Sequence, residues 1–190
     1  MKRRILSIAV AMVMCLALLP APAGAANPIT QYIDKGDVTI RNAGSYIITQ
    51  TDPSTPTQNT ITINPTASGA AIDITLKDVN IDASQGSYSA AIGVYNGAQV
   101  TITLEGNNFV KSPRNKAGIF TNEYSNSLTI RGEGSLEAWG GDYGAGIGGA
   151  LMDPCGTIQI ESGTIRAYGG KGAAGIGGGD VIAYGSKFPS

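Results

Sequence analysis

SLTIRGEGSLEAWGGDYGAGIGG, residues 127–149, is followed shortly afterwards by GTIQIESGTIRAYGGKGAAGIGG, residues 156–178. The two stretches share a strand-like run, a second apolar run and a glycine-rich turn, in the same order. Two earlier segments, residues 72–99 and 100–126, repeat this plan with fewer glycines. A recurring period of this kind indicates a repeat architecture, in which each repeat contacts only its neighbours.

Each repeat has three apolar positions that we expect to align with those of the next repeat. Three short strands in a repeat of about 28 residues predict one coil of a parallel β-helix, so the fold class is an all-β, single-stranded solenoid. The expected first set is Leu76, Leu104, Ile130 and Ile160; the second is Ile81, Phe109, Leu136 and Ile165; the third is Ile92, Ile119, Ile147 and Ile176.

The glycine-rich turns also satisfy the glycine spacing of a dinucleotide-binding loop, in GAGIGG (144–149) and again in GGKGAAGIGGG (169–179). A phosphate-binding loop needs a following helix whose amino end faces the phosphates. The chain after residue 149 instead contains Pro154 and a further strand pattern. We therefore expect these glycines to serve tight turns between strands.

The segment 1–25 has the pattern of a signal peptide. Basic residues at 2–4 precede an apolar run at 5–19, and Ala23-Gly24-Ala25 forms a small-residue cleavage site. We expect a secreted or cell-surface protein, with no stretch after residue 26 long enough to span a membrane. The predicted organisation is a signal peptide at 1–25, irregular opening coils or a cap at 26–71, β-helix repeats at 72–185 and a tail at 186–190.

The amino-acid composition argues against several classes of function. Histidine is absent and the net charge is −1, while 27 of the 190 residues are glycine. The lack of histidine excludes Ser–His–Asp and Cys–His catalysis and removes the commonest zinc ligand. The absence of a basic surplus argues against a nucleic-acid partner. The carboxylates are scattered, so we expect no enzyme, and Cys155 is expected to be a small buried residue.

Outward positions on the strands are the candidate binding residues. Alignment of LEAWGG (136–141) with IRAYGG (165–170) places Glu137 beside Arg166 on neighbouring coils. The same alignment places Trp139 beside Tyr168. We expect a surface ion pair worth under about 1 kcal/mol from the first pair. The aromatic pair is either a platform for a sugar ring or a packing ladder that covers the sheet. The candidate carbohydrate-binding residues are Trp139, Tyr143 and Tyr168.

A second candidate site lies in DITLKDVNIDAS, residues 73–84, where Asp78, Asn80 and Asp82 alternate. Their oxygens are ligands that calcium prefers, and weak calcium sites suffice outside the cell. The alternative is that they are turn residues on a solvated face.

Several stretches resemble known bacterial proteins. GSLEAWGGDYGAGIGG and GTIRAYGGKGAAGIGGG resemble glycine-rich repeats of secreted Firmicutes surface proteins. GSYIIT, NTITI, IDITLKDVNIDAS and SAAIGV resemble segments of the bacterial carbohydrate-binding domain-containing family. The resemblance implies a right-handed parallel β-helix that binds cell-wall polysaccharide and calcium without evident catalysis. It implies metal binding at Asp78 and Asp82, which match the acidic segment.

From these observations we expect a secreted or surface-attached, non-catalytic β-helix module that binds extracellular polysaccharide, with calcium as a candidate cofactor. The alternatives are a structural or adhesin segment without a glycan ligand, and a relative of polysaccharide lyases. Further domains of a longer surface protein are candidate partners, because no capping motif follows the fourth repeat.

Overall fold

The computed structural model describes residues 27–86, 88–122 and 126–180. This part of the chain is all-β, and its one short helix is the 3-10 turn η2 (Ile33–Lys35). The predicted signal peptide at 1–25 and tail at 186–190 lie outside the described residues, and the predicted repeats are described as far as residue 180.

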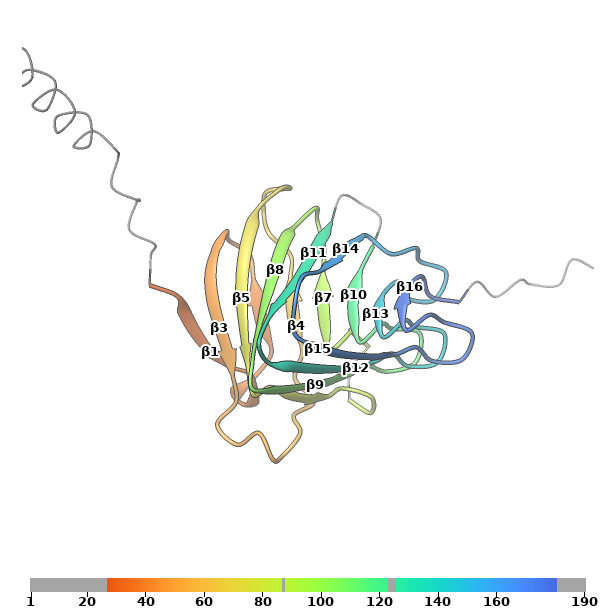
Figure 1. The fold of residues 1–190 in the computed structure, drawn as a ribbon, viewed down its shortest axis with the longest axis horizontal. Helices are drawn as coiled ribbons and strands as arrows, with labels where there is room; N and C mark the ends of the chain where they lie inside the picture. Colours follow the sequence, from red (N-terminus) through yellow and green to blue (C-terminus); the bar gives the residue numbers. More distant parts are fainter. Residues whose placement is uncertain (1–26, 87, 123–125, 181–190) are drawn as a thin grey trace, which may run out of the picture.

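The strands form three parallel sheets (Figure 1). Sheet A contains β1 (Ile29–Tyr32), β3 (Gly44–Thr49), β5 (Ala71–Lys77), β8 (Gln99–Glu105), β11 (Ser127–Gly132) and β14 (Thr157–Ile160). Sheet B contains β2 (Val38–Ile40), β4 (Ile61–Ile63), β7 (Ile92–Val94), β10 (Ile119–Thr121), β13 (Ile147–Gly148) and β16 (Ile176–Gly177). Sheet C contains β6 (Asn80–Asp82), β9 (Asn107–Lys111), β12 (Ser135–Trp139) and β15 (Thr164–Tyr168).

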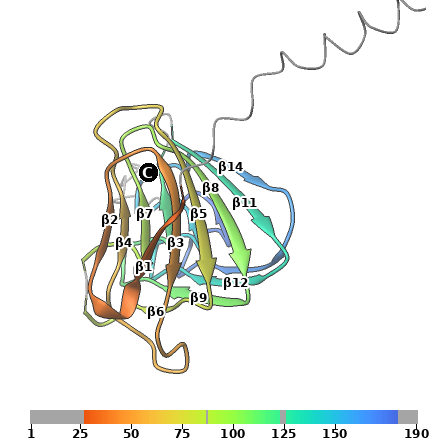
Figure 2. The same cartoon turned by 90° about the vertical axis from the view of Figure 1, so that its left-hand side faces the viewer.

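From β5 onward the chain visits sheet A, then sheet C, then sheet B, and begins the next coil on sheet A. β11, β12 and β13 thus form one coil, and β14, β15 and β16 form the next. Each strand pairs in parallel with the equivalent strand of the next coil, as Ile74 does with Ile102 and Ile102 with Ile130. The predicted parallel β-helix is confirmed. Figure 2 looks along the stack from the end at which β1 lies.

The segment predicted to form opening coils joins the same sheets. β2 pairs with β4, β4 pairs with β7, and β3 lies between β1 and β5. Its irregular parts are η2 and the connection between β3 and β4, where Thr57 makes a single parallel bridge to Ile81 of sheet C.

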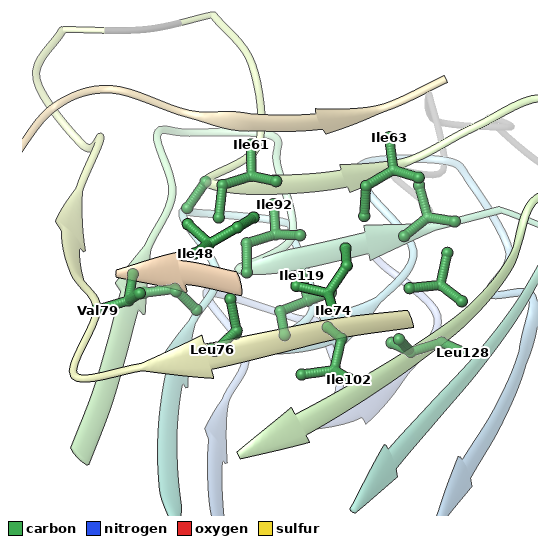
Figure 3. Close-up of a cluster of buried hydrophobic side chains, with 14 of the residues drawn as sticks. Ile48, Ile61, Ile63, Ile74, Leu76, Val79, Ile92, Ile102, Ile119 and Leu128 are labelled. Atoms are coloured by element: carbon green, nitrogen blue, oxygen red, sulfur yellow. The ribbon is translucent and has the colours of Figure 1, made fainter. Parts of the chain in front are cut away.

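Alternation of apolar and polar residues explains the interior. In β5, Ile72, Ile74 and Leu76 are buried while Ala71, Asp73 and Lys77 are exposed, because successive side chains in a strand point to opposite faces. Aliphatic side chains from sheets A and B meet in the space between the sheets (Figure 3). Equivalent residues on successive coils stack into ladders along this space.

The third predicted set is confirmed: Ile119 pairs with both Ile92 and Ile147, and Ile147 pairs with Ile176. In the first predicted set, the alignment of Leu104 with Ile130 is wrong by two positions. Ile130 pairs with Ile102, whereas the partner of Leu104 is Gly132.

The second set contains a larger error, because Phe109 is not an interior residue. Val110 is the buried partner of Ile81, and Phe109 pairs with Asn80 and Glu137 on the outer face. The inward position before it is taken by Asn108, which is buried. Its side chain accepts a hydrogen bond from the Val79 amide and donates to carbonyl oxygens of its own turn and of the next coil. These bonds make the burial of an amide favourable.

The glycine-rich turns pass close to the neighbouring coil. A Cβ atom on Gly146 would lie 2.6 Å from the Gly175 oxygen and 2.6 Å from the Tyr168 nitrogen, both backbone atoms. Only glycine fits such an approach. After GAGIGG the chain continues through a turn into β14 and no helix follows, as the sequence predicts.

Two further predictions concern the burial of Cys155 and the presence of membrane spans. Cys155 is free, but it is half-buried rather than fully buried. In the described ranges, no helix has the length and apolar character needed to cross a membrane.

Candidate functional site

The outer face of sheet C carries most of the residues that the sequence singled out; Asp78 and Tyr143 lie outside its strands. Two outward ladders run across its strands, because parallel pairing places equivalent side chains side by side. One ladder consists of Asn80, Phe109, Glu137 and Arg166. The other consists of Asp82, Lys111, Trp139 and Tyr168. The predicted neighbours Glu137–Arg166 and Trp139–Tyr168 are therefore register partners.

Trp139 and Tyr168 stack on one another. Their ring centroids are 4.1 Å apart and their planes differ by 21°. A face-to-face stack of this kind covers one face of each ring. The other face of Trp139 looks toward the coil of β9, where Lys111 is its register partner. The rings therefore stand on edge rather than lying flat on the sheet.

Tyr168 has a different position from Trp139 because β15 is the edge strand of sheet C. No described strand lies beyond it, and the Tyr168 side chain is 39% exposed. The outer face of the Tyr168 ring is therefore the open aromatic surface of the stack.

The predicted ion pair between Glu137 and Arg166 is wrong. Glu137 Oε1 accepts a hydrogen bond from Trp139 Nε1, at 2.7 Å. No ion pair in the described part of the chain joins Glu137 to Arg166. The Arg166 guanidinium also forms no hydrogen bond with the residues that the structure describes. The indole holds the carboxylate in place, and the guanidinium remains available to a ligand.

A groove of about 490 Å³ lies on this face, beside the aromatic stack. Its lining combines hydrogen-bonding side chains with one aromatic ring: Asn80, Asn107, Ser135, Glu137, Arg166 and Phe109. Within the groove, Ser135 Oγ donates to Asn107 Oδ1 at 2.9 Å. Asn80 Nδ2 donates to the Pro53 carbonyl oxygen at 2.8 Å, which ties the loop after β3 to the groove.

Tyr143 does not join the aromatic stack. It lies in the turn after β12 with a positive φ of 68°, and the Arg114 guanidinium lies 5.4 Å from the centroid of its ring. This contact has the geometry of a cation–π interaction. The structure thus brings together two of the three predicted carbohydrate-binding residues.

Asp78 and Asp82 each have a structural partner. Asp78 Oδ1 accepts the Asn107 amide of the next coil at 2.9 Å, and Asp78 itself has a positive φ. Asp82 Oδ1 accepts the Ser84 amide, and its other oxygen lies 3.7 Å from Lys111 Nζ. Partial burial raises the pKa of Asp82, but the hydrogen bonds from Ser84 and the charge of Lys111 outweigh it, so the pKa is lowered.

These contacts do not match a calcium site, which needs six to eight oxygens. Over residues 27–86, 88–122 and 126–180, no three acidic, histidine or cysteine side chains gather where they could hold a metal ion. The calcium site remains a prediction from the sequence that the geometry does not strengthen.

Among the polar and aromatic groove residues named above, sequence reasoning misses Asn107, Phe109 and Ser135. Phe109 is missed because an apolar residue in a strand is expected in the interior. The polar Asn108 next to it is the available signal, since the two residues must face opposite sides.

Comparison of the chain with protein-family models, with curated proteins and with solved structures finds no match. The resemblance to a carbohydrate-binding family therefore remains a prediction from the sequence.

Proposed function

We propose that this protein is a non-catalytic module that binds extracellular polysaccharide on the outer face of sheet C. The observation that carries the proposal is the groove of about 490 Å³, whose lining includes Arg166, together with the exposed ring of Tyr168 two positions further along β15. Secretion to the cell surface or medium belongs to the same proposal, since the segment 1–25 has the pattern of a signal peptide.

The groups on this face suit a sugar polymer. Arg166 and Tyr168 both point outward on β15 two positions apart, which corresponds to roughly 6.6 Å along a strand. A sugar ring stacked on Tyr168 would thus place its hydroxyls within reach of the unpaired guanidinium. The amide and hydroxyl groups of Asn80, Asn107 and Ser135 extend the hydrogen-bonding surface along the groove. Such a shallow polar groove with one aromatic surface suits weak binding that is repeated along a polymer.

The carboxylates of this face are already engaged, which argues against catalysis. Glu137 is held by the indole of Trp139, and Asp78 is held by the Asn107 amide. Hydrolysis of a glycosidic bond needs two carboxyl groups that are free to act on opposite sides of that bond.

A structural role for the solenoid is the second candidate, and it is favoured by the apolar end of the stack. Ile160 and Ile176 of the last described coil are 41% and 45% exposed. An end of this kind suits a segment that stacks against another coil.

Affinity electrophoresis tests the proposal. The folded protein is run in gels that contain pectin, xylan or a cellulose-type polymer, each with calcium and with a chelator. We expect retardation by at least one polymer, to the same extent under both conditions because Asp78 and Asp82 are already engaged. Retardation abolished by the chelator would instead support the calcium site.

Matched variants locate the binding face. Tyr168→Ala and Arg166→Ala are expected to remove most of the retardation, whereas Trp139→Phe keeps it because Trp139 supports the stack rather than presenting a free face. Tyr32→Ala is the control, since Tyr32 is equally aromatic and 50% exposed but lies on β1 at the far end of the stack. Folded protein that passes every gel without retardation would move the assignment to the structural role.

A further inference from the structure

A second hollow, of about 510 Å³, lies at the turn that leads from sheet C to sheet B. Ser84 comes two residues after β6 and Pro113 two residues after β9, so the hollow lies just beyond the carboxyl ends of these strands. It shares no lining residue with the groove on sheet C. Its lining residues are Ser84, Tyr88, Pro113, Arg114, Asn115 and Lys116.

This hollow differs in charge from the groove. Arg114 and Lys116 both line it, and no carboxylate does. The groove is lined by Asp78 and Glu137 as well as by Arg166. Two further hollows on the described surface are each lined by two carboxylates and no cation. Because a recess lined by charges of one sign concentrates ligands of the opposite sign, the hollow at the turn favours an anion.

The charges of the two cations are not neutralised by the protein. No ion pair in the described ranges involves Arg114 or Lys116, although Asp142 lies in the neighbouring turn. The Arg114 guanidinium lies over the ring of Tyr143, 5.4 Å from its centroid. Such a stack covers one face of the guanidinium and leaves the N–H groups at its edge open to an acceptor.

The turn that carries the two cations is held in place by the next coil. The Asn115 amide donates to the Asp142 carbonyl oxygen at 2.7 Å, and the Lys116 carbonyl oxygen accepts from the Gly141 amide at 3.0 Å. Gly141 packs so closely behind the turn that a Cβ atom on it would meet the Pro113 carbonyl group. The backbone beneath both cations is therefore fixed before a ligand arrives, which lowers the entropy lost on binding.

Tyr88 adds an aromatic surface to the hollow. Its side chain is 98% exposed, so no described residue covers its ring. An aromatic ring offers an apolar face to a sugar, while its hydroxyl group is able to hydrogen-bond. Two cations next to such a ring suit a sugar unit that carries an anionic group.

The hollow and the groove are close enough for one polymer to reach both. Phe109 lines the groove and Pro113 lines the hollow, and four residues of chain span at most about 14 Å. Lys111 and its register partner Trp139 point outward between them. A polysaccharide that runs along β9 therefore contacts the groove first and then the hollow.

We propose that this hollow binds an acidic sugar unit, which carries a carboxylate or a sulfate, of a polysaccharide whose neutral units lie in the groove. The choice of a sugar as the ligand rests on the proposed function. Arg114 and Lys116 donate charge-assisted hydrogen bonds to the anionic group, and Tyr88 packs against the sugar ring. Asp78 and Glu137 disfavour an anion in the groove, so the ligand is a polymer with acidic units among neutral ones.

Titration of the folded, ¹⁵N-labelled protein with single sugars, followed by NMR, tests the proposal. The probes are methyl glucuronide and glucose 6-sulfate, with methyl glucoside as the neutral match. We expect at least one acidic sugar to shift the amides of residues 114–116 saturably. The neutral sugar is expected to bind there about tenfold more weakly, because it lacks the charge-assisted hydrogen bonds.

Matched variants assign the effect to the hollow. Arg114→Gln combined with Lys116→Gln is expected to weaken binding of the acidic sugar about tenfold and to leave binding of the neutral sugar unchanged. Arg41→Gln is the control, since Arg41 is an exposed cation that follows β2. An equal loss in Arg41→Gln would show an effect of net charge alone and would overturn the proposal.

The remaining outcomes separate this proposal from the proposed function. No saturable shift of residues 114–116 with either acidic sugar would overturn it, and so would equal shifts with acetate, which would show a site for small anions only. Retardation of the protein by a neutral polymer without such shifts would leave the proposed function standing. Saturable shifts without retardation by any polymer would support the hollow as a sugar site and count against binding of a polymer.

Discussion

Asn108 shows how a single polar residue sets the orientation of a strand. Its side chain fills the inward corner between sheets A and C and satisfies groups on both neighbouring coils. By occupying that corner it turns Phe109 outward, into the groove on sheet C. Hydrophobicity alone would place Asn108 outside and Phe109 inside. Asn108 instead lies in the interior, and Phe109 lies at the candidate binding site.

Asn108→Ala is therefore expected to destabilise the fold by about 1–3 kcal/mol, because the Val79 amide loses its acceptor in a buried position. Urea denaturation followed by circular dichroism measures the change. Asn107→Ala is the matched control, since Asn107 is exposed and its substitution is expected to stay within about 0.5 kcal/mol. Equal losses of stability in the two variants would mean that the hydrogen bond from the Val79 amide to Asn108 does not stabilise the fold.

The sequence predicted the residue pairs on the outer face better than it predicted their geometry. The alignment of the last two repeats correctly paired Trp139 with Tyr168 and Glu137 with Arg166. It could not show that the indole would donate to Glu137, because a rotamer and a hydrogen-bond partner are not set by spacing. The prediction of an ion pair between Glu137 and Arg166 was wrong for this reason.

At the scale of the strands, side chains alternate between the two faces with a period of two residues, and this period limits how well a sequence alone can fix the register between strands. A shift of one residue moves every side chain to the opposite face, whereas a shift of two leaves the faces unchanged. The alignment of Leu104 with Ile130 was wrong by two positions, and the alternation in β8 and β11 could not detect the error. The isoleucine of the third set was placed correctly because, in the last two coils, it is the one large apolar residue within a glycine-rich stretch.

The glycine-rich turns fix the distance between coils. Gly146→Ala places a methyl group against backbone atoms of Gly175 and Tyr168 at 2.6 Å, and we expect a loss of about 1–3 kcal/mol because the packed coils cannot separate freely. Gly178→Ala in the next coil is the control, since nothing lies within 4 Å of the added atom. Thermal unfolding of the two variants checks this. A Gly146→Ala protein as stable as the Gly178→Ala protein would show that the turns can shift to accommodate the added methyl group.

At the scale of the molecule, stability in a solenoid comes from contacts between neighbouring coils. A coil in the middle of the stack has two neighbours, and the last described coil has one. The end at β1 compensates in part, because Ile33, Val38 and Ile40 are buried there while Ile29 and Tyr32 of β1 are exposed. The end at β14–β16 does not compensate within the described residues, since Ile160 and Ile176 remain exposed. The repeat pattern predicted the stack, but it contained no information on how its two ends differ.

Local opening is therefore expected to be asymmetric along the stack. Amides of β1, β14, β15 and β16 should exchange fastest, those of β2 more slowly, and those of β7 and β8 slowest, because the free energy of local opening follows the burial of the side chains that a strand contributes. Hydrogen exchange with mass spectrometry measures this order, and the central strands serve as the internal reference. Exchange of β2 as fast as that of β14, β15 and β16 would mean that the buried Val38 and Ile40 add no protection. An order in which β14 is as slow as β8 would show that this end of the stack is already covered.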